Sequence, residues 1–312
     1  MILLVGAGFM AKDYVNVLDA LNQKFLIVGR GEESAARLEE GSRRQVVRGG
    51  LENYLNSTSE LITSAIVSVG VDELAKNTML LIRHGIKHIL VEKPAALSMA
   101  EIKQLAMVSE EYKVNLYVGY NRRFYSSVVA AKKIIEQDGG VQSYHFEITE
   151  RSHVIQNIQK HEKIKENWFL ANTTHVVDLA FFLGGAPEVL TCFTAGTTSW
   201  HSRSAVFSGA GKAFNGALFS YIGNWGAPGG WGVEIQTKIH RLIFKPLEKL
   251  QIQKLGSSNI DQVGLNDNLD IHYKPGLYLQ LHAFLNNENT NLCSISEHFD
   301  NVGHYLSIAG YN

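Results

Sequence analysis

The first 120 residues alternate short apolar runs with segments in which apolar residues recur at helical spacing. Short runs rich in Ile, Leu and Val are typical of strands buried on both faces of a parallel sheet. We predict such strands at residues 2–5, 25–28, 46–47, 65–69, 86–91 and 116–118. We predict helices between them at residues 9–21, 32–40, 73–84 and 99–112. Strands that alternate with helices form βαβ units, so the fold class of residues 1–120 is α/β, with a doubly wound parallel sheet.

The pattern changes after residue 120. Helical spacing at 126–137 and 174–183 flanks a strand-like segment at 142–150, and a last helix is predicted at 278–286. Between these helices, strands dominate, at residues 188–195, 205–210, 213–223, 232–239, 241–245 and 248–254. Consecutive strands with short turns favour antiparallel pairing. Residues 121–312 are therefore predicted to form an α+β domain with a mostly antiparallel sheet.

Composition excludes several classes of protein. The net charge of −1 gives no reason to expect nucleic acid or an anionic membrane as a partner. No apolar run reaches the roughly 20 residues that span a bilayer, and the apolar start 1–6 is too short for a signal peptide. The two cysteines, Cys192 and Cys293, suit a reducing compartment, so we expect a cytoplasmic protein. Although 12 histidines are present, none has the spacing of a metal site.

A glycine-rich turn follows the first predicted strand. Residues 6–11 read Gly-Ala-Gly-Phe-Met-Ala, which fits the dinucleotide-binding pattern G-x-G-x-x-G/A of Rossmann domains. Gly6 permits the tight turn, Gly8 lets the backbone approach a pyrophosphate, and Ala11 lets helix and strand pack closely. The free N–H groups of the helix that follows attract phosphate. We predict cofactor contacts at Gly6, Gly8, Phe9 and Met10, and at Val69 and Gly70 where the fourth strand ends.

The end of the second strand bears on the identity of the dinucleotide. An NAD site usually carries a carboxylate there, on the ribose 2′-hydroxyl. This strand instead ends at Arg30. An arginine can pair with a 2′-phosphate through charge-assisted hydrogen bonds. The sequence therefore predicts that NADP(H) is favoured over NAD(H).

Glu92-Lys93-Pro94 closes the apolar run 86–91. Charged side chains at the end of a buried strand pack poorly, but the carboxyl edge of a parallel sheet is where α/β proteins bind ligands. Pro94 restricts the backbone of the residue before it and so gives Lys93 a defined direction. The competing interpretation of the triplet alone is a solvated strand end.

Two further motifs complete a family pattern. Residues 119–124 read Gly-Tyr-Asn-Arg-Arg-Phe, and residues 172–178 read Asn-Thr-Thr-His-Val-Val-Asp. With the glycine turn and the Glu-Lys-Pro triplet, their order and spacing resemble those of the Gfo/Idh/MocA oxidoreductases, which include glucose–fructose oxidoreductase and inositol dehydrogenase. The resemblance covers nearly the whole chain.

The resemblance implies hydride transfer between a nicotinamide and a sugar or sugar-like alcohol. It implies that Lys93 contacts substrate and cofactor near the reacting carbon and that His175 donates or accepts the proton. Glu92 and Asn121 would lie near the nicotinamide. The substrate-binding residues that we predict are Asn121, Arg122, Arg123, Asn172 and Asp178.

The chemistry independently favours the same pair. Oxidation of an alcohol needs a base for the hydroxyl proton, and histidine titrates nearest to neutral pH. His175 and Asp178 are three residues apart on a predicted helix and therefore share a face. The competing interpretation is that His175 is a buried structural histidine and Asp178 a structural partner.

One departure from the family pattern concerns the substrate. Many relatives have an aspartate four residues before the histidine, where this chain has Ala171. This change argues against a simple aldose or inositol and leaves a nucleotide-linked or otherwise modified sugar as a candidate.

Three functions remain open from the sequence. The first is an NAD(P)-dependent oxidoreductase acting on a sugar derivative through Lys93 and His175. The second is an imine or tetrapyrrole-type reductase on the same scaffold, and the third is a non-catalytic NADP(H)-binding regulatory protein. Open sheet faces in this family generally pair between subunits, so the resemblance also implies a homo-oligomer, a dimer or tetramer.

Overall fold

The computed structural model describes residues 1–311, which form two compact units. The first unit consists of residues 1–121 and 269–300, and the second of residues 122–268 and of the chain from residue 301 onward. The prediction that everything after residue 120 belongs to the second domain is therefore wrong for residues 269–300. This segment returns to the first unit through strand β15 (Cys293–Ser294) and helix α11 (Leu277–Leu285). Both make long-range contacts that local sequence patterns do not encode, β15 with strand β6 and α11 with helix α1.

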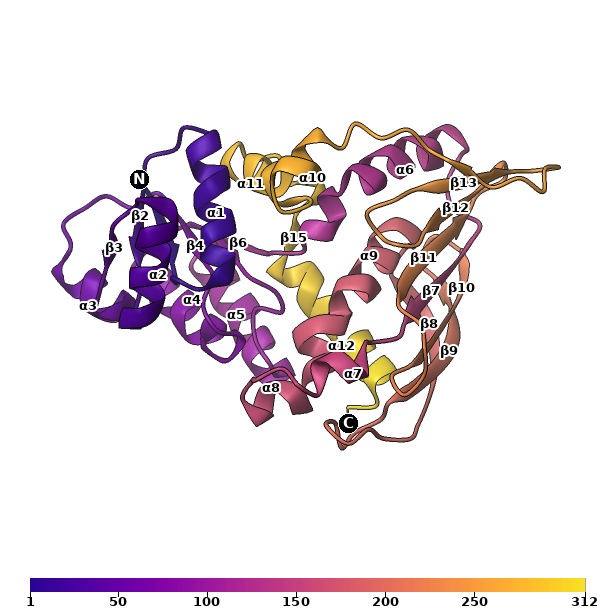
Figure 1. Cartoon of the computed structure of the whole chain (residues 1–312), viewed down its shortest axis with the longest axis horizontal. Helices are drawn as coiled ribbons and strands as arrows, with labels where there is room; N and C mark the ends of the chain where they lie inside the picture. Colours follow the sequence, from indigo (N-terminus) through magenta and orange to yellow (C-terminus); the bar gives the residue numbers. More distant parts are fainter. Residues whose placement is uncertain (312) are drawn as a thin grey trace. The chain divides into compact units, whose positions relative to one another are not determined.

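The first unit contains a seven-stranded sheet with strand order β15-β6-β5-β4-β1-β2-β3 (Figure 1). Its parallel strands are β1 (Ile2–Val5), β2 (Phe25–Val28), β3 (Val46–Val47), β4 (Ser64–Val67), β5 (His88–Val91) and β6 (Asn115–Val118). The order reverses between β1 and β4, which is the switch point of a Rossmann fold. The predicted doubly wound sheet is confirmed.

The helices of the first unit largely follow the predicted pattern. They are α1 (Phe9–Ala20), α2 (Glu32–Ser42), α3 (Gly50–Ser57), α4 (Leu74–Arg83), α5 (Met99–Glu111), α10 (Asn268–His272) and α11, with short 3₁₀ turns η1 (Val71–Glu73), η2 (Asn121–Phe124) and η4 (Asn289–Asn291). Ser98 caps α5, because its Oγ accepts a hydrogen bond from the Glu101 N–H. Helix α3 was not predicted, since two glycines with positive φ, Gly49 and Gly50, stand at its start.

The second unit contains an eight-stranded sheet with order β14-β13-β12-β11-β7-β10-β9-β8. Its strands are β7 (Ser143–Ile148), β8 (Pro187–Ala195), β9 (Val206–Ala213), β10 (Leu218–Asn224), β11 (Trp231–Gln236), β12 (His240–Phe244), β13 (Gln251–Lys254) and β14 (Asp261–Gln262). Among the described residues, only the β7–β10 pair of this second sheet is parallel. The predicted mostly antiparallel sheet is confirmed. The expected strand 213–223 begins only at Leu218, because residues 214–217 form the turn after β9.

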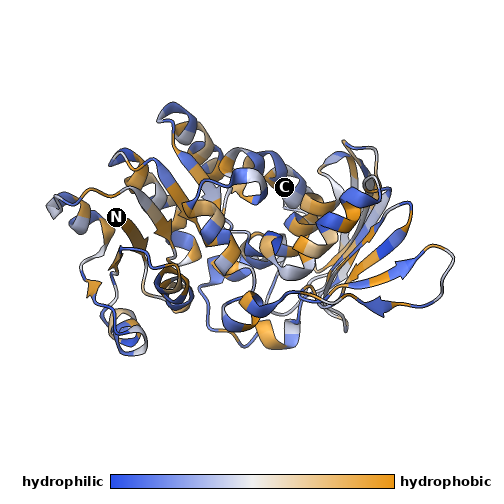
Figure 2. Cartoon of the chain, turned by 90° about the horizontal axis from the view of Figure 1, so that it is seen from above, coloured by the Kyte–Doolittle hydropathy of each residue, from blue (hydrophilic) through white to orange (hydrophobic). Residues whose placement is uncertain are grey.

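Helices cover one face of this second sheet. They include α6 (Ser126–Gln137), α9 (Thr174–Gly184) and the later part of α12 (Ile295–Ala309), and two short helices, α7 (Ser152–Ile155) and α8 (Glu162–Glu166), precede α9. Inward side chains of β7 pack against α9, as where Phe146 meets Phe181 at 6.0 Å between ring centroids. The strands alternate between apolar and polar residues along their length (Figure 2). Their other face is therefore open.

Among the helices within residues 1–311, none is both long and apolar enough to cross a lipid bilayer.

Candidate active site

The glycine turn lies at the carboxyl end of β1, beside the end of β4. Gly6 has φ of 116°, and a Cβ there would come within 2.1 Å of the Ser68 carbonyl oxygen. Only glycine fits this position. A Cβ at Gly8 would meet no atom within 4 Å, so open space lies in front of the first turn of α1. The turn therefore fits a pyrophosphate, which the free N–H groups of α1 would bind. Phe9 is exposed next to it.

Arg30 extends from the end of β2 into solvent. Its side chain is 74% exposed, and Nη1 lies 3.4 Å from Oε1 of Glu73 in η1. Val69 and Gly70 come between β4 and η1. The predicted cofactor residues that follow β1, β2 and β4 thus share one edge of the sheet.

The Glu-Lys-Pro triplet follows β5 on the same edge. Tyr14 of α1 is fully buried, and its hydroxyl donates a 2.7 Å hydrogen bond to Oε1 of Glu92. Desolvation raises the pKa of the partly buried Glu92 carboxyl, against the opposing effects of Tyr14 and the nearby lysines. The Lys93–Pro94 peptide bond is cis, and Nε2 of the buried His298 lies 2.9 Å from the Pro94 carbonyl. The residues on both sides of Lys93 thus make hydrogen bonds to other parts of the first unit.

Asn121 is buried in the first unit. Its Nδ2 donates to the carbonyl oxygen of Pro275 at 2.8 Å, and Oε1 of Gln280 accepts from its backbone N–H. The residues that hold it come from the returning segment 269–300. Its expected roles near the nicotinamide and in substrate binding stay predictions.

His175 lies in the first turn of α9, 7% exposed. Its ring centroid is 6.2 Å from that of Trp231, the first residue of β11. The guanidinium of Arg122 stacks over the same tryptophan, with its Cζ 4.9 Å from the centroid of the Trp231 ring. Two predicted site residues, Arg122 and His175, thus flank one tryptophan.

Arg123 and Asp178 form a buried ion pair. Nε and Nη2 of Arg123 donate to the two carboxylate oxygens of Asp178, at 2.9 and 2.6 Å. Their side chains are 2% and 1% exposed. Because this bidentate contact occupies both oxygens of the carboxylate, the geometry favours a structural role for the pair, and substrate binding by these two residues stays an untested prediction.

A buried carboxylate that the sequence analysis did not single out lies beside the histidine motif. Glu150 follows β7 and is 7% exposed. It accepts hydrogen bonds from Asn172 Nδ2 at 3.0 Å and from Thr173 Oγ1 at 2.6 Å. Ala171, which precedes Asn172 in the chain, is also buried. The signal was present in the sequence, since Glu150 ends a predicted strand just as Glu92 does.

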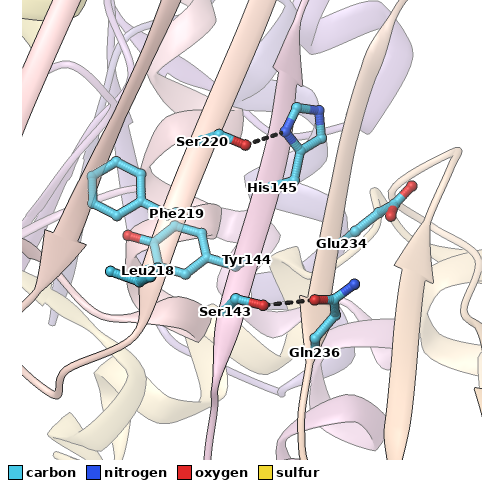
Figure 3. A pocket seen from close by; sticks show the side chains of 8 residues that line it. All are labelled: Ser143, Tyr144, His145, Leu218, Phe219, Ser220, Glu234 and Gln236. Atoms are coloured by element: carbon cyan, nitrogen blue, oxygen red, sulfur yellow. Dashed lines mark hydrogen bonds between the residues drawn. The ribbon is translucent and has the colours of Figure 1, made fainter. Parts of the chain in front are cut away.

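The open face of the second sheet carries a shallow pocket of about 400 Å³ (Figure 3). His145 Nδ1 lies 3.0 Å from Ser220 Oγ, and Ser143 donates to Gln236. Exposed apolar side chains lie along the neighbouring strands of this face, namely Val189, Phe193, Leu218 and Ile222. These apolar side chains of the open face are exposed, whereas His175 and the residues next to it in the chain are buried.

Comparison with known proteins identifies the first domain. Residues 1–120 match the model of the family described as an oxidoreductase family with an NAD-binding Rossmann fold, GFO_IDH_MocA. The resemblance predicted from the motifs is confirmed for this domain, which matches the NAD-binding Rossmann domain of the Gfo/Idh/MocA oxidoreductases. A search of curated protein sequences finds no significant match.

Solved structures extend the likeness to the whole fold. A levoglucosan dehydrogenase in complex with NADH and L-sorbose has a TM-score of 0.81 at 17% identity, over 99% of this chain and 95% of that one. UDP-N-acetylglucosamine 3-dehydrogenase from Acidithiobacillus ferrooxidans has a TM-score of 0.75 at 15% identity, over 98% and 95%. A protein described as an NADPH-dependent oxidoreductase from Desulfitobacterium hafniense has a TM-score of 0.79 at 16% identity, over 99% and 94%. At these identities the likeness establishes the fold.

Proposed function

We propose that the protein transfers hydride between a nicotinamide cofactor and a hydroxyl or carbonyl carbon of a sugar or sugar derivative. The observation that carries this proposal is the position of Lys93, directly after β5 at the edge where the glycine turn also lies. The similar structures support it, since two of them are dehydrogenases named for a sugar or a nucleotide sugar. A nucleotide-linked sugar is a candidate substrate.

Each residue has one task in this proposal. The glycine turn and the first N–H groups of α1 bind the pyrophosphate, and the nicotinamide, when bound, supplies or accepts hydride at C4. Lys93 holds the oxygen on the reacting carbon. His175 takes the hydroxyl proton during oxidation and returns it during reduction. Arg122, stacked on Trp231, shapes the substrate side.

The test replaces Lys93 and His175 singly by alanine. Each change should lower kcat by roughly 10²- to 10⁴-fold, because it removes a group that handles the reacting oxygen or its proton, while NADPH binding stays nearly intact. Lys87→Ala and His145→Ala are matched controls, since Lys87 lies at the opposite end of β5 and His145 on the open sheet face. Activity is followed by nicotinamide absorbance on a panel of sugars, nucleotide sugars and cyclic imines.

Near-normal turnover in both alanine variants would refute the assignment. Turnover of imines alone would favour the reductase reading, and cofactor binding without turnover of any panel member would favour a regulatory protein.

For the cofactor, we propose a preference for NADP(H) based on Arg30. Its exposed guanidinium lies where the ribose 2′ position is expected, and its contact with Glu73 is long at 3.4 Å. Arg30→Ala should therefore weaken NADPH binding and leave NADH binding almost unchanged. Glu73→Gln should strengthen NADPH binding, because it removes a negative charge from the neighbourhood of a 2′-phosphate. Both dissociation constants are measured by fluorescence titration, and a constant NADPH-to-NADH ratio across the three proteins would contradict the proposal.

We also propose a homo-oligomer, a dimer or tetramer, that covers the open face of the second sheet. The exposed apolar side chains of that face support this, since large exposed apolar patches mark interaction sites. We also expect a reducing, cytoplasmic compartment, because two cysteines are too few for a disulfide framework.

A further inference from the structure

The orientation of the Asn172 side chain follows from its partner. A carboxylate has acceptor atoms only, so the end of the amide that meets Glu150 must be the NH₂ group. Asn172 Nδ2 lies 3.0 Å from Oε1 and 3.3 Å from Oε2 of Glu150. Its Oδ1 therefore points away from Glu150, and within residues 1–311 no hydrogen bond reaches that oxygen.

The position of Glu150 is itself well determined. Thr173 Oγ1 donates to the same Oε1 at 2.6 Å, and both Thr173 and Glu150 are buried. Two donors from consecutive residues thus bind one carboxylate at the end of β7. An amide bonded to both carboxylate oxygens cannot rotate without losing two charge-assisted hydrogen bonds.

Asn172 is also the residue that solvent can reach in the segment that leads into α9. From Trp168 to Asp178 every other residue is buried, and Asn172 alone is partly exposed. It lies in a π-helical turn, Phe169–Thr173, where the Thr174 N–H reaches the Phe169 carbonyl five residues earlier. Such turns are frequent at functional sites. Asn172 is three residues before His175, so both lie towards one side of this helix.

We infer that Glu150 is a positioning residue that fixes Asn172 as a hydrogen-bond acceptor, and that Asn172 Oδ1 binds a hydroxyl group of the substrate. This inference rests on the proposed function and sharpens it. A fixed acceptor selects a ligand that donates, so the substrate carries a free hydroxyl near the reacting carbon. An analogue that has a methoxy group or a hydrogen in place of this hydroxyl should bind more weakly.

The position of the Glu150 carboxylate also determines that a neutral group, the Asn172 amide, faces the substrate. In relatives with an aspartate before the histidine, a charged group comes from the helix itself. In this chain Ala171 occupies that position, and the carboxylate comes from the end of β7 with a neutral amide in front of it. The substrate hydroxyl therefore meets an amide oxygen, which binds it without taking its proton at neutral pH.

The test is a double-mutant cycle on a substrate that the wild-type enzyme turns over. Asn172→Ala should raise KM about tenfold and Glu150→Gln about threefold, the range expected for a lost or loosened neutral hydrogen bond. A carboxamide still accepts from Thr173 but also offers a donor, so it no longer dictates the orientation of Asn172. Both changes should leave kcat within about twofold, because the contact is made equally in the ground and transition states.

Non-additivity distinguishes positioning from a general structural effect. In the Asn172→Ala background, Glu150→Gln should change KM by less than about 1.5-fold, since the residue it orients is already gone. A substrate analogue without the hydroxyl should show no effect of Glu150→Gln. Glu147→Gln is the matched control, because Glu147 lies on β7, just before Glu150 in the chain, and pairs with Lys245 on the open face. Additive effects in the double variant would overturn the inference.

A second readout does not depend on turnover. The side-chain amide resonances of Asn172, identified by their loss in Asn172→Ala, should shift in Glu150→Gln and stay in place in Glu147→Gln. No shift would overturn the inference. If the wild type turns over no sugar yet this shift is seen, the proposed function falls and the contact between Glu150 and Asn172 stands, so the two failures are distinguishable.

Discussion

At the scale of single residues, Glu92 shows how the fold places an unfavourable group. A carboxyl at the end of a buried strand is partly removed from water, and this desolvation raises its pKa. The hydroxyl of Tyr14 donates to it, and burial likewise raises the pKa of Tyr14 well above its usual value. Burial thus disfavours the ionised form of Glu92, while the hydrogen bond from Tyr14 holds this residue in place directly before Lys93.

The raised pKa of Glu92 predicts that the stability of the protein depends on pH. A carboxyl whose pKa is raised on folding favours the folded state below its unfolded pKa of 4.5, and this contribution is lost as the pH rises through the folded pKa. Glu92→Gln cannot ionise and still accepts from Tyr14. Relative to wild type, the free energy of unfolding of the variant should therefore increase above about pH 4.5. Urea unfolding between about pH 4 and about pH 8 measures this difference.

Glu39 provides a control of opposite sign. The hydrogen bond from Arg48 lowers the pKa of Glu39 to about 2. Its contribution is present above the unfolded pKa and is lost as the pH falls through about 2, so Glu39→Gln should cost stability at neutral pH. The same pH trend in both variants would show that the Glu92 difference does not come from its burial.

At the scale of elements, the Arg123–Asp178 pair joins η2 to α9. Both residues are fully or almost fully buried, and η2 and α9 are more than 50 residues apart in the chain. The guanidinium also lies over the Phe182 ring at 4.7 Å. The pair thus holds α9, the helix that carries His175, in place against η2.

Removal of one partner should be more harmful than removal of both. Asp178→Leu leaves a buried guanidinium opposite an apolar side chain and should lower the free energy of unfolding by about 3–5 kcal/mol. The double variant Arg123→Met, Asp178→Leu should recover much of this loss. Chemical denaturation measures both. If Asp178 instead binds substrate, a conservative Asp178→Asn change would raise KM with little loss of stability, contrary to the structural role that the geometry favours.

At the scale of the whole molecule, the second sheet has one face covered by helices and one face open. The open face carries exposed Leu218 and Ile222 on β10, and Phe193 on β8, beside the polar residues of Figure 3. Exposed apolar side chains on a sheet are stabilised when another surface covers them. This is the structural basis of the proposed homo-oligomer.

The prediction at this scale concerns assembly. Leu218→Glu together with Ile222→Glu should shift the protein from a dimer or tetramer to a monomer, because each change places a charge in the apolar patch. Light scattering after gel filtration measures the mass. Leu61→Glu is the control, since Leu61 is even more exposed but lies in the first unit. A monomeric wild type, or unchanged mass in the double variant, would contradict this role of the open face.

Local patterns accounted for much of the fold. The apolar runs located the parallel strands, Ser98 and Glu101 marked the start of α5, and the glycine turn was found where Gly6 needs positive φ. Helix α3 was missed because Gly49 and Gly50 weaken its pattern. The first-unit membership of residues 269–300 was missed because it depends on pairing of β15 with β6, a contact across 175 positions in the chain.

The sequence by itself determined the class of the protein, since glycine turns, strand periodicity and motif order depend on neighbours within a few residues. Only the tertiary structure decided what each polar side chain contacts. In the tertiary structure, the Asp178 carboxylate pairs with Arg123, and the Asn121 amide donates to the Pro275 carbonyl oxygen. The Glu150 carboxylate accepts hydrogen bonds from residues just before His175. The physical reason is that buried polar groups must find partners in space, and those partners come from strands and helices that are far apart in the chain.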